Sequence, residues 1–330
     1  MSSSLKSNKI KVAFENSLGK RRKFPGKFRM SAAGKRLREL MRSSTVALPG
    51  AFNGMVARMA ADKGFNGVYV SGAAISASAG VPDIGILTLD EFCHKIREIV
   101  QVSGLPVLAD GDTGFGEIEM VTRTVSEYMH AGAAGIHLED QVFPKRCGHL
   151  DGKAVVPANI MIEKIRRAKR VARDPQGFVV CARTDARNVE GFDFAVERAR
   201  RYVMDAGADM IFPEGLSDLS EFRVFAERMR AIGDVGLAPQ GGPFLLANMT
   251  EFGKTEFISI QDFEAAGYHA VIYPVSTFRC AMKAAEDCLD MLKKEGSVQG
   301  MVPRMQTRAE LYKTIRYKPG EEWSFPASSS

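Results

Sequence analysis

Several features are missing from this 330-residue sequence, and each absence excludes a class of protein. No apolar run approaches the roughly 20 residues that a membrane-spanning helix needs. The start of the chain has no apolar segment followed by a small-residue cleavage site, which argues against a secretory signal. The five cysteines are an odd number without a Cys-x-x-Cys pair, so neither a disulfide framework nor a structural zinc site is expected. These absences predict a protein of a reducing compartment such as the cytoplasm.

The positive charge is concentrated at the start of the chain. Residues 1–30 carry nine Lys or Arg side chains against Glu15 alone, a net of +8, so the rest of the chain carries −2 within the overall +6. The body therefore has no excess of positive charge that would predict nucleic-acid binding. We interpret residues 1–39 as a solvated N-terminal arm. The basic, acid-poor composition leaves an organelle-targeting segment as the alternative, which the many lysines weaken.

Short apolar runs alternate along the chain with longer helical patterns. There are eight such runs, at residues 46–48, 67–70, 106–109, 135–138, 178–182, 210–212, 244–247 and 270–273. They lack strict polar alternation, which is typical of parallel strands covered on both faces. Glycine follows several helical patterns, as in Ala131-Gly132-Ala133, where it supplies a left-handed cap before the next strand. The repeat predicts an α/β protein with a (β/α)8 TIM-type barrel.

A doubly wound open sheet is the alternative fold. No Gly-x-Gly-x-x-Gly follows the first predicted strand, so a dinucleotide-binding fold has less support. The length suits one large core, and we expect the barrel with its C-terminal helices to span residues 40–318. Residues 281–296 are expected to form the eighth barrel helix, and residues 319–330 a frayed tail.

Polar side chains, most of them ionisable, follow nearly every predicted strand. The loops that follow barrel strands carry the catalytic groups in such folds, so these side chains are expected to meet at one end of the barrel. Chance explains so many charged groups poorly, because burying a charge is costly unless partners converge. The candidates are Ser71, Asp110, Asp112, Glu139, Asp140, Arg183, Asp185, Glu214, Asn248, Thr250 and Arg279.

Asp110 and Asp112 are two residues apart on an extended segment and so share one face. Two carboxylates placed in this way suit a hard cation such as Mg2+ or Mn2+. The run Asp-Gly-Asp-Thr-Gly is also rich in turn formers, and a plain turn is the alternative. Glu139 and Glu214, after other strands, are candidates to hold metal-bound waters. His137 alternates with Glu139 and is interpreted as a core residue.

The run Lys145-Arg146-Cys147-Gly148-His149 places a thiol among cationic groups, which favour the thiolate. Such a thiol can exchange protons or attack carbon. The alternative for Cys147 is a small buried hydrophobic residue, against which its charged neighbours argue. The other cysteines lie in apolar or helical settings and are assigned to the core; they are Cys93, Cys181, Cys280 and Cys288.

Further runs occur in order along most of the chain. They are Tyr69-Val70-Ser71-Gly72, Asp110-Gly111-Asp112-Thr113-Gly114-Phe115-Gly116, Glu139-Asp140-Gln141, Ala182-Arg183-Thr184-Asp185-Ala186, Phe212-Pro213-Glu214, Asn248-Met249-Thr250-Glu251-Phe252-Gly253 and Met305-Gln306-Thr307-Arg308. With the Lys-Arg-Cys-Gly-His run, they resemble the isocitrate lyase/phosphoenolpyruvate mutase superfamily over roughly residues 40–318. The cysteine run is specific for its carbon–carbon lyase branch, and the whole set resembles the members that cleave 2-methylisocitrate. Isocitrate lyases proper are longer, with an insertion that this chain lacks.

The resemblance implies a barrel whose eighth helix is exchanged between subunits, in a homotetramer. It implies Mg2+ held by Asp110 and Asp112. The residues implied around the metal are Asp83, Glu139 and Glu214. The catalytic residues implied are Cys147, Tyr69 and Arg183. The substrate-binding residues implied are Ser71, Gly72, Ala73, Cys147, Gly148, Arg183, Glu214, Asn248, Met249, Thr250, Arg279 and Arg308.

The activity implied is Mg2+-dependent cleavage of (2S,3R)-2-methylisocitrate to pyruvate and succinate, a step of propionate catabolism through the methylcitrate cycle. In that reaction Tyr69 is the candidate base, Arg183 stabilises the charge of the departing product, and Cys147 returns a proton to it. A related lyase or hydrolase acting on isocitrate, 2,3-dimethylmalate or oxaloacetate is the first alternative. A non-catalytic scaffold whose basic segment docks on an acidic partner is the second. Neither a nucleic acid nor a membrane is an expected partner.

Overall fold

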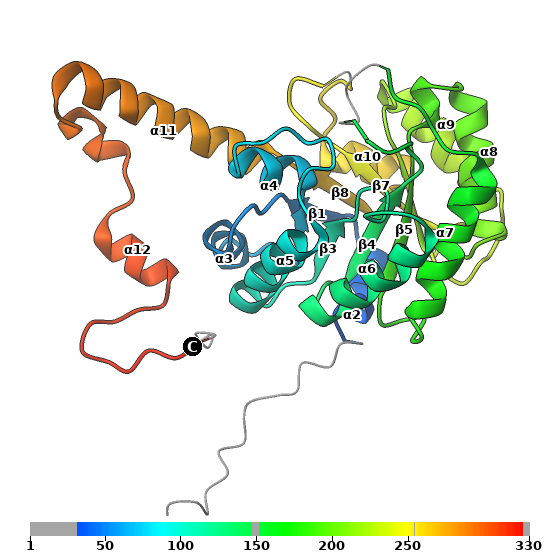
Figure 1. The fold of residues 1–330 in the computed structure, drawn as a ribbon, viewed down its shortest axis with the longest axis horizontal. Coiled ribbons are helices and arrows are strands. Elements are labelled where there is room, and N and C mark those ends of the chain that lie inside the picture. The colour runs from blue at the N-terminus through cyan, green and yellow to red at the C-terminus, as the bar shows by residue number, and fades with distance from the viewer. Residues whose placement is uncertain (1–31, 147–151, 254, 326–330) are drawn as a thin grey trace, which may run out of the picture.

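The computed structural model describes residues 32–146, 152–253 and 255–325. Eight parallel strands form a nearly closed barrel in the order β1-β8-β7-β6-β5-β4-β3-β2 (Figure 1). The strands are β1 (Val46–Pro49), β2 (Val68–Val70), β3 (Val107–Asp110), β4 (Gly135–Glu139), β5 (Val179–Thr184), β6 (Met210–Pro213), β7 (Phe244–Asn248) and β8 (Ala270–Tyr273). A parallel bridge between Gly50 and Tyr69 joins β1 to β2. The predicted (β/α)8 barrel is confirmed.

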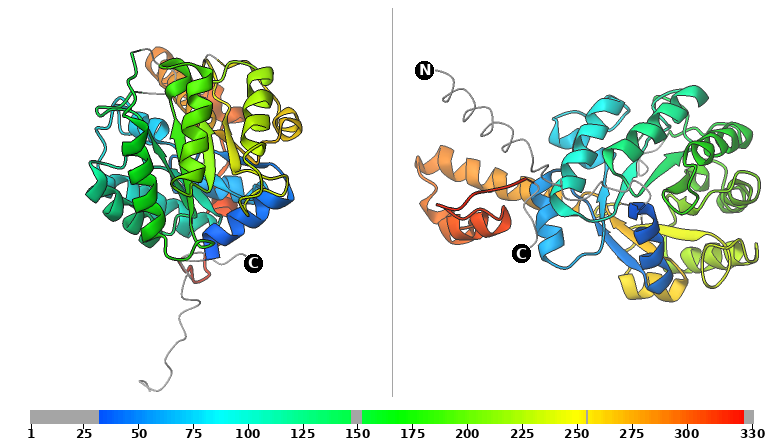
Figure 2. Two further views of the ribbon diagram at one scale, coloured as in Figure 1. Left: turned by 90° about the vertical axis from the view of Figure 1, so that its right-hand side faces the viewer. Right: turned by 90° about the horizontal axis from the view of Figure 1, so that it is seen from below.

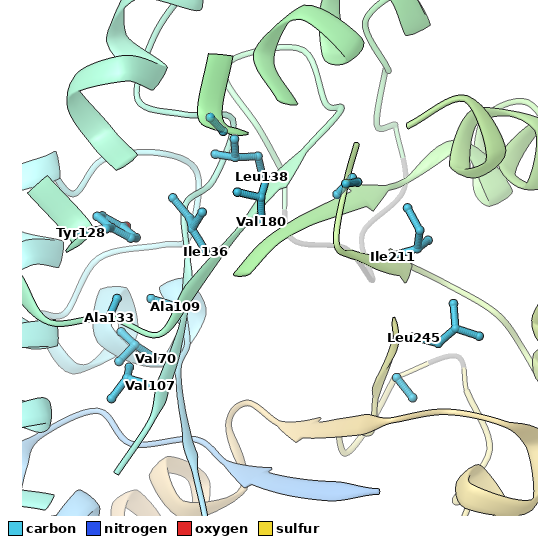
Figure 3. Packing of buried hydrophobic residues seen from close by; sticks show 14 of the residues in the cluster. Val70, Val107, Ala109, Tyr128, Ala133, Ile136, Leu138, Val180, Ile211 and Leu245 are labelled. Atoms are coloured by element: carbon cyan, nitrogen blue, oxygen red, sulfur yellow. The ribbon is translucent and has the colours of Figure 1, made fainter. Parts of the chain in front are cut away.

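Side-chain alternation along each strand divides the core into two layers. In β3, Val107 and Ala109 pack outward against the helices, and Leu108 packs inside the barrel. Figure 3 shows part of the outward layer, where Val107 and Ala109 lie near Tyr128 of a covering helix. Because the period of a strand is two, the next inward position after Leu108 is Asp110 at the strand end. The same rule brings polar groups from several strands to one end of the barrel interior.

Helices follow the strands and cover the outside of the barrel, as Figure 2 shows. They are α3 (Gly54–Asp62), α5 (Leu89–Ser103), α6 (Ile118–Ala131), α7 (Ala158–Val171), α8 (Phe192–Met204), α9 (Leu219–Arg230) and α10 (Ile260–Ala266), with a short 3-10 turn η1 (Ala186–Asn188). Gly132 ends α6 with φ 93°, and Gly267 ends α10 with φ 94°, in the left-handed conformation that favours glycine. The short helix α4 (Gly72–Ser78) follows β2 directly.

One helix before the first strand, α2 (Ala32–Ser43), adds to the interior core. Its Leu37 and Met41 pack with the residues inside the barrel. Its Arg38 is fully buried, with Nη2 2.9 Å from Asp209 Oδ2. The predicted boundary of the N-terminal arm at residue 39 is therefore wrong, because the amphipathic pattern of α2 begins at Ala32. Residues 1–31 lie outside the described residues.

The last helices leave the barrel. Helix α11 (Ser276–Glu295) begins after β8 and points away from the strands, and η2 (Gln299–Arg304) and α12 (Arg308–Thr314) follow it on that side (Figures 1 and 2). No residue of α11 is buried within the chain. The assignment of Cys280 to the core is therefore wrong, and Cys288 is only half-buried, whereas Cys93 and Cys181 are buried as predicted. Among the helices in the described ranges, none has both the length and the apolar character needed to cross a membrane.

Candidate active site

A cavity of about 320 Å³ lies at the carboxyl ends of the strands. Its walls come from the ends of β2, β3 and β5 to β8 and from the loops that follow them. The predicted site residues that line it are Tyr69, Ser71, Ala73, Asp83, Asp110, Arg183, Glu214, Asn248, Thr250 and Arg279. Side chains predicted from separate strand ends therefore meet in one place, as the barrel geometry requires.

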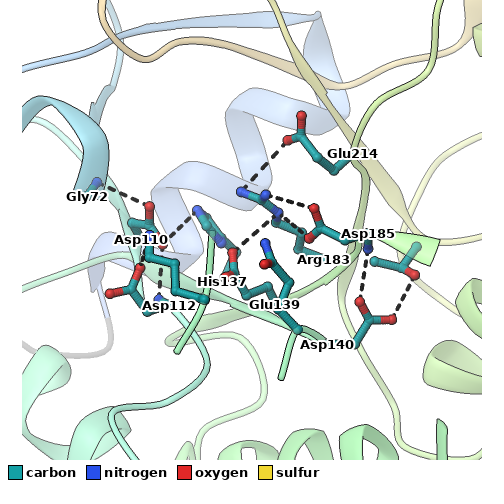
Figure 4. A network of polar contacts seen from close by, with 12 residues as sticks. Gly72, Asp110, Asp112, His137, Glu139, Asp140, Arg183, Asp185 and Glu214 are labelled. Carbon is teal, nitrogen blue, oxygen red and sulfur yellow. Dashed lines mark hydrogen bonds and ion pairs between the residues drawn. The ribbon is translucent and has the colours of Figure 1, made fainter. Parts of the chain in front are cut away.

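The carboxylate of Asp110 is held by backbone donors on two sides. The N–H of Gly72, at the start of α4, donates to Oδ2 over 3.1 Å, and the N–H of Asp112 donates to Oδ1 over 3.0 Å (Figure 4). A Cβ at Gly72 would lie 2.8 Å from Asp110 Oδ2, so glycine is required for this approach. Burial raises the pKa of Asp110, but His137, Lys145, Arg183 and the Asp112 amide outweigh it and lower that pKa to about 2.

Asp112 is buried beside Asp110 in a backbone conformation with φ 45°. Its Oδ1 lies 2.6 Å from Lys145 Nζ, and the same ammonium group pairs with Asp83. Burial raises the pKa of Asp112 to about 7, with Asp110 and Asp83 adding to the rise and Lys145 opposing it. Two adjacent buried carboxylates resist double ionisation unless a cation is present, so this pair favours a cation.

The pair satisfies the chemical demands of Mg2+. The Asp110 carboxylate lines the cavity and Asp112 lies directly behind it, and Glu139, 1% exposed, has an Oε1 atom without a hydrogen-bond partner in the described ranges. Such an oxygen can accept from a metal-bound water. Within the described residues no group of three or more His, Cys, Asp or Glu side chains forms a protein cage. A site of two carboxylates is typical of Mg2+, which usually keeps several water molecules in its coordination shell.

Arg183 lies at the centre of the second polar cluster, at the end of β5. Its Nε and Nη2 donate to the two oxygens of Asp185 over 2.9 and 3.1 Å (Figure 4). Its Nε is also 3.4 Å from Glu139 Oε2, and its Nη1 is 3.7 Å from Glu214 Oε2, beyond hydrogen-bond distance. Nη1 donates to none of the described residues, and Arg183 lines the cavity. This edge of the guanidinium suits a substrate carboxylate.

Tyr69 and His137 form a pair inside the barrel mouth. The Tyr69 hydroxyl lies 2.7 Å from His137 Nε2 and 3.5 Å from Asp110 Oδ2. Burial lowers the pKa of His137 to about 4, so its ring is neutral at pH 7 and shares a hydrogen bond with the phenol. Burial and the charge of Asp110 raise the pKa of Tyr69. The phenol is therefore protonated at neutral pH, and the charges that support Asp110 there come from Lys145 and Arg183.

The family of the chain follows from its sequence. The model of the phosphoenolpyruvate phosphomutase family matches residues 37–293. The chain belongs to this family. It is 52% identical over 82% of its length to a probable 2-methylisocitrate lyase 1 of Corynebacterium glutamicum, covering 85% of that protein. It is 45% identical over 86% of its length to 2-methylisocitrate lyase of Bacillus subtilis, covering 89% of that protein.

Solved structures of the same superfamily share the fold. Oxaloacetate acetylhydrolase in complex with 3,3-difluorooxalacetate aligns with a TM-score of 0.78 at 34% identity, over 86% of this chain and 93% of that one. Phosphonopyruvate hydrolase in complex with oxalate and Mg2+ aligns with a TM-score of 0.74 at 27% identity, over 86% and 95% of the two chains. The family thus includes enzymes with different activities on one barrel.

Some predicted site residues of this family member do not line the cavity. Met249 is buried, and its Sδ accepts from the Ile258 N–H, so its side chain belongs to the core. Arg308 is exposed on α12, away from the cavity walls. Gly72, Asp112 and Glu139 lie just behind the wall, in contact with residues that line it. Cys147 and Gly148 lie outside the described residues.

Sequence reasoning missed some members of the site. Lys145 was interpreted only as a neighbour of the thiol, yet its ammonium group contacts Asp83 and Asp112. Phe252 also lines the cavity, and the Arg279 guanidinium lies 5.2 Å from its ring centroid. No sequence pattern gives these long-range contacts, although the place of Lys145 two residues before the candidate thiol indicates that its segment is functional.

Proposed function

We propose that this chain is a carbon–carbon lyase that cleaves 2-methylisocitrate to pyruvate and succinate. The observation that carries the proposal is its 45–52% identity to methylisocitrate lyases over more than four fifths of the chain, combined with a cavity that Asp110 and Arg183 line, with Asp112 directly behind Asp110. The oxaloacetate acetylhydrolase structure is less similar, at 34% identity. A 2-oxo acid hydrolase is therefore the second candidate.

The proposal includes a Mg2+ requirement, with Asp110 and Asp112 as the residues that would hold the ion. Bound there, Mg2+ lowers the pKa of an α-hydroxyl group and offsets negative charge on the substrate. Asp83 and Glu139 are placed to accept from metal-bound waters, as Asp83 lines the cavity and Glu139 has a buried oxygen to which no described residue donates. Mn2+ has the same preference for oxygen ligands and is the expected substitute.

The chain's own residues supply binding and proton transfer. Arg183 binds a substrate carboxylate through Nη1 and stabilises the charge that develops on the departing succinate. Tyr69 remains the candidate base, but its raised pKa requires that a cation in the cavity stabilise the phenolate. Cys147 is proposed to return the proton to the succinate carbon, since the thiol belongs to a cationic run.

We also propose that the protein is a homotetramer in which α11 packs on a neighbouring subunit. Met282, Leu289 and Leu292 of α11 are 44%, 65% and 47% exposed, which is unfavourable for an amphipathic helix in water. Exchange of this helix would cover these side chains. It would also carry α12, and Arg308 with it, to another barrel. The cytoplasmic location and the role of the basic N-terminal segment remain predictions.

A substrate panel tests the proposed activity. The purified protein with Mg2+ would be assayed for pyruvate, by coupling to lactate dehydrogenase, on 2-methylisocitrate and 2,3-dimethylmalate, and for glyoxylate on isocitrate. Release of oxalate from oxaloacetate would be followed separately. We expect kcat/KM for 2-methylisocitrate to exceed the others by about tenfold or more, since a single group is worth about 10- to 200-fold in a fitted pocket. Preferential release of oxalate would replace the proposal with the hydrolase.

A further inference from the structure

We propose that Lys153 is a positioning residue for the reaction, which orients Arg183 through Asp185. The inference rests on the proposed lyase activity and adds a residue that lies outside the cavity. Lys153 follows β4 on the connection to α7, and its side chain is only 2% exposed. Its Nζ lies 2.6 Å from Asp185 Oδ1, and the Asp185 side chain is fully buried.

Asp185 joins the two cations. Its Oδ2 accepts from Arg183 Nε, and its Oδ1 accepts from both Arg183 Nη2 and Lys153 Nζ. Both carboxylate oxygens therefore bind the same edge of the guanidinium. Its own N–H donates to Asp140 Oδ1 over 2.9 Å, which fixes its backbone. A carboxylate held at this many points cannot rotate without breaking a buried ion pair. Arg183 is thereby fixed with Nη1 directed away from Asp185.

Charge balance explains why Lys153 is needed. Arg183 faces three buried carboxylates, those of Asp185, Glu139 and Glu214. A single guanidinium cannot satisfy all three, and without a second cation it has competing partners on the cavity side. The ammonium of Lys153 compensates Asp185 and stabilises it as the bidentate partner. In its absence the Asp185 carboxylate loses one of its anchors, and we expect it to rotate and Arg183 to move with it, which would displace Nη1 from the place where it meets substrate.

The backbone around Lys153 is fixed by pairing with the end of β4. Gln141 and Val155 form an antiparallel bridge. The Val142 N–H donates to Ala154 O and the Val156 N–H donates to Asp140 O, both over 2.8 Å. This short two-stranded pairing holds Lys153 beside the strand end that carries Glu139. The main chain on either side of Gln141 and Val155 is therefore fixed, and it places Lys153 within reach of Asp185.

The test is Lys153→Met, which removes the charge and keeps the length of the side chain, with Lys153→Arg as the conservative variant. We expect Lys153→Met to lower kcat about 10- to 100-fold, the loss typical of small misplacement of a reacting group. Mg2+ affinity, measured by calorimetry with the metal alone, is expected to stay within about twofold of wild type, as Lys153 contacts neither Asp110 nor Asp112. Lys153→Arg is expected to restore most of kcat.

Lys169→Met is the matched control, because Lys169 also pairs with a buried carboxylate, 2.7 Å from Asp209, but away from the cavity residues. It should lower stability while leaving kcat and KM as in wild type.

A double mutant supplies a second readout. After Asp185→Asn, the further change Lys153→Met should lower kcat by less than about twofold, since Lys153 acts through Asp185. Additive losses would overturn the inference. If Lys153→Met does not fold, Lys153→Gln takes its place in both experiments.

Oxalate binding in the presence of Mg2+ separates this inference from the proposed function. Calorimetry with oxalate reports on Arg183 and the metal site whichever acid is the true substrate. Weaker oxalate binding in Lys153→Met, by about tenfold, supports the positioning role even if wild type does not cleave 2-methylisocitrate. Wild-type kcat and oxalate affinity in Lys153→Met would show that Lys153 is only structural.

Discussion

At the scale of single residues, the site consists of two groups of opposite charges. Lys145 pairs with Asp83 and with Asp112, which lies beside Asp110, and Arg183 lies close to three carboxylates. Each group is buried, so every charge in it depends on its partners. This mutual dependence makes the two aspartates suitable for a metal and leaves one edge of Arg183 for a substrate.

The first prediction concerns the proposed proton donor. Cys147→Ser is expected to lower kcat roughly 10³-fold, within the range that general acid–base groups contribute, because a hydroxyl is a far weaker acid than a thiol. The fold and the Mg2+ affinity should stay as in wild type. Steady-state kinetics and calorimetry with Mg2+ measure the two properties. Cys93→Ala, a change in the core, is the control that should keep kcat. Full activity of Cys147→Ser would remove the thiol from the mechanism.

The second prediction concerns His269 and pH. Its Nδ1 accepts from the Leu245 N–H, and burial and nearby Arg230 lower the pKa of its ring to about 4. The unfolded chain, with a pKa near 6.5, takes up a proton before the folded one does. The free energy of unfolding therefore falls as the pH falls through 6.5 toward 4, by roughly 2 kcal/mol for this group between pH 6.5 and 5.

Urea unfolding between pH 8 and 5 measures this dependence. His269→Gln lacks the titrating ring, so its curve against pH should be shallower than that of wild type below pH 6.5 and parallel to it above pH 7. Curves that stay parallel down to pH 5 would contradict the role assigned to His269.

Many single residues of the site could be predicted from the sequence, because they directly follow apolar runs that are recognisable as strands. Asp110, Glu139, Arg183 and Glu214 stand at strand ends, where the barrel geometry alone brings side chains together. The contacts of Lys145 and Lys153 were not predictable, because they depend on how a long connection folds back over the strands. The protonated phenol of Tyr69 was also not predictable, since it follows from burial.

At the scale of elements, the strands were predicted well because buried parallel strands form continuous apolar runs. The helix boundaries were predicted less well. Helix α2 begins at Ala32, within the predicted arm, and α11 begins at Ser276, before the predicted start at residue 281. The periodicity of α11 shows an amphipathic helix but does not specify which barrel it covers. Its departure from its own barrel could not be predicted from local pattern.

The third prediction concerns α11. Leu289→Asp places a carboxylate on its exposed apolar face, where the proposed exchange would bury it without a partner. We expect the subunit dissociation constant to rise roughly 100-fold, from a cost of about 3 kcal/mol. Light scattering after size exclusion measures the mass. Phe194→Asp on α8, at a side chain that is similarly exposed (63%), is the control that should keep the assembly. An unchanged mass for Leu289→Asp would contradict the helix exchange.

At the scale of the whole molecule, the residues that stabilise the barrel and the residues of the candidate active site lie in different places. Helix α2 and the interior apolar residues stabilise the interior of the barrel, while the charged groups gather at the carboxyl ends of the strands. Family members with other activities keep the same barrel. The substrate preference is therefore a property of the loops and cavity walls, and not of the fold.

The most direct test of the central claim is the release of pyruvate from 2-methylisocitrate by the purified full chain, with and without EDTA. We expect turnover with Mg2+, loss of nearly all activity after chelation, and recovery when Mg2+ is added in excess of EDTA. Turnover that is unaffected by chelation would contradict the metal role of Asp110 and Asp112. Absence of pyruvate in the presence of Mg2+ would contradict the lyase itself.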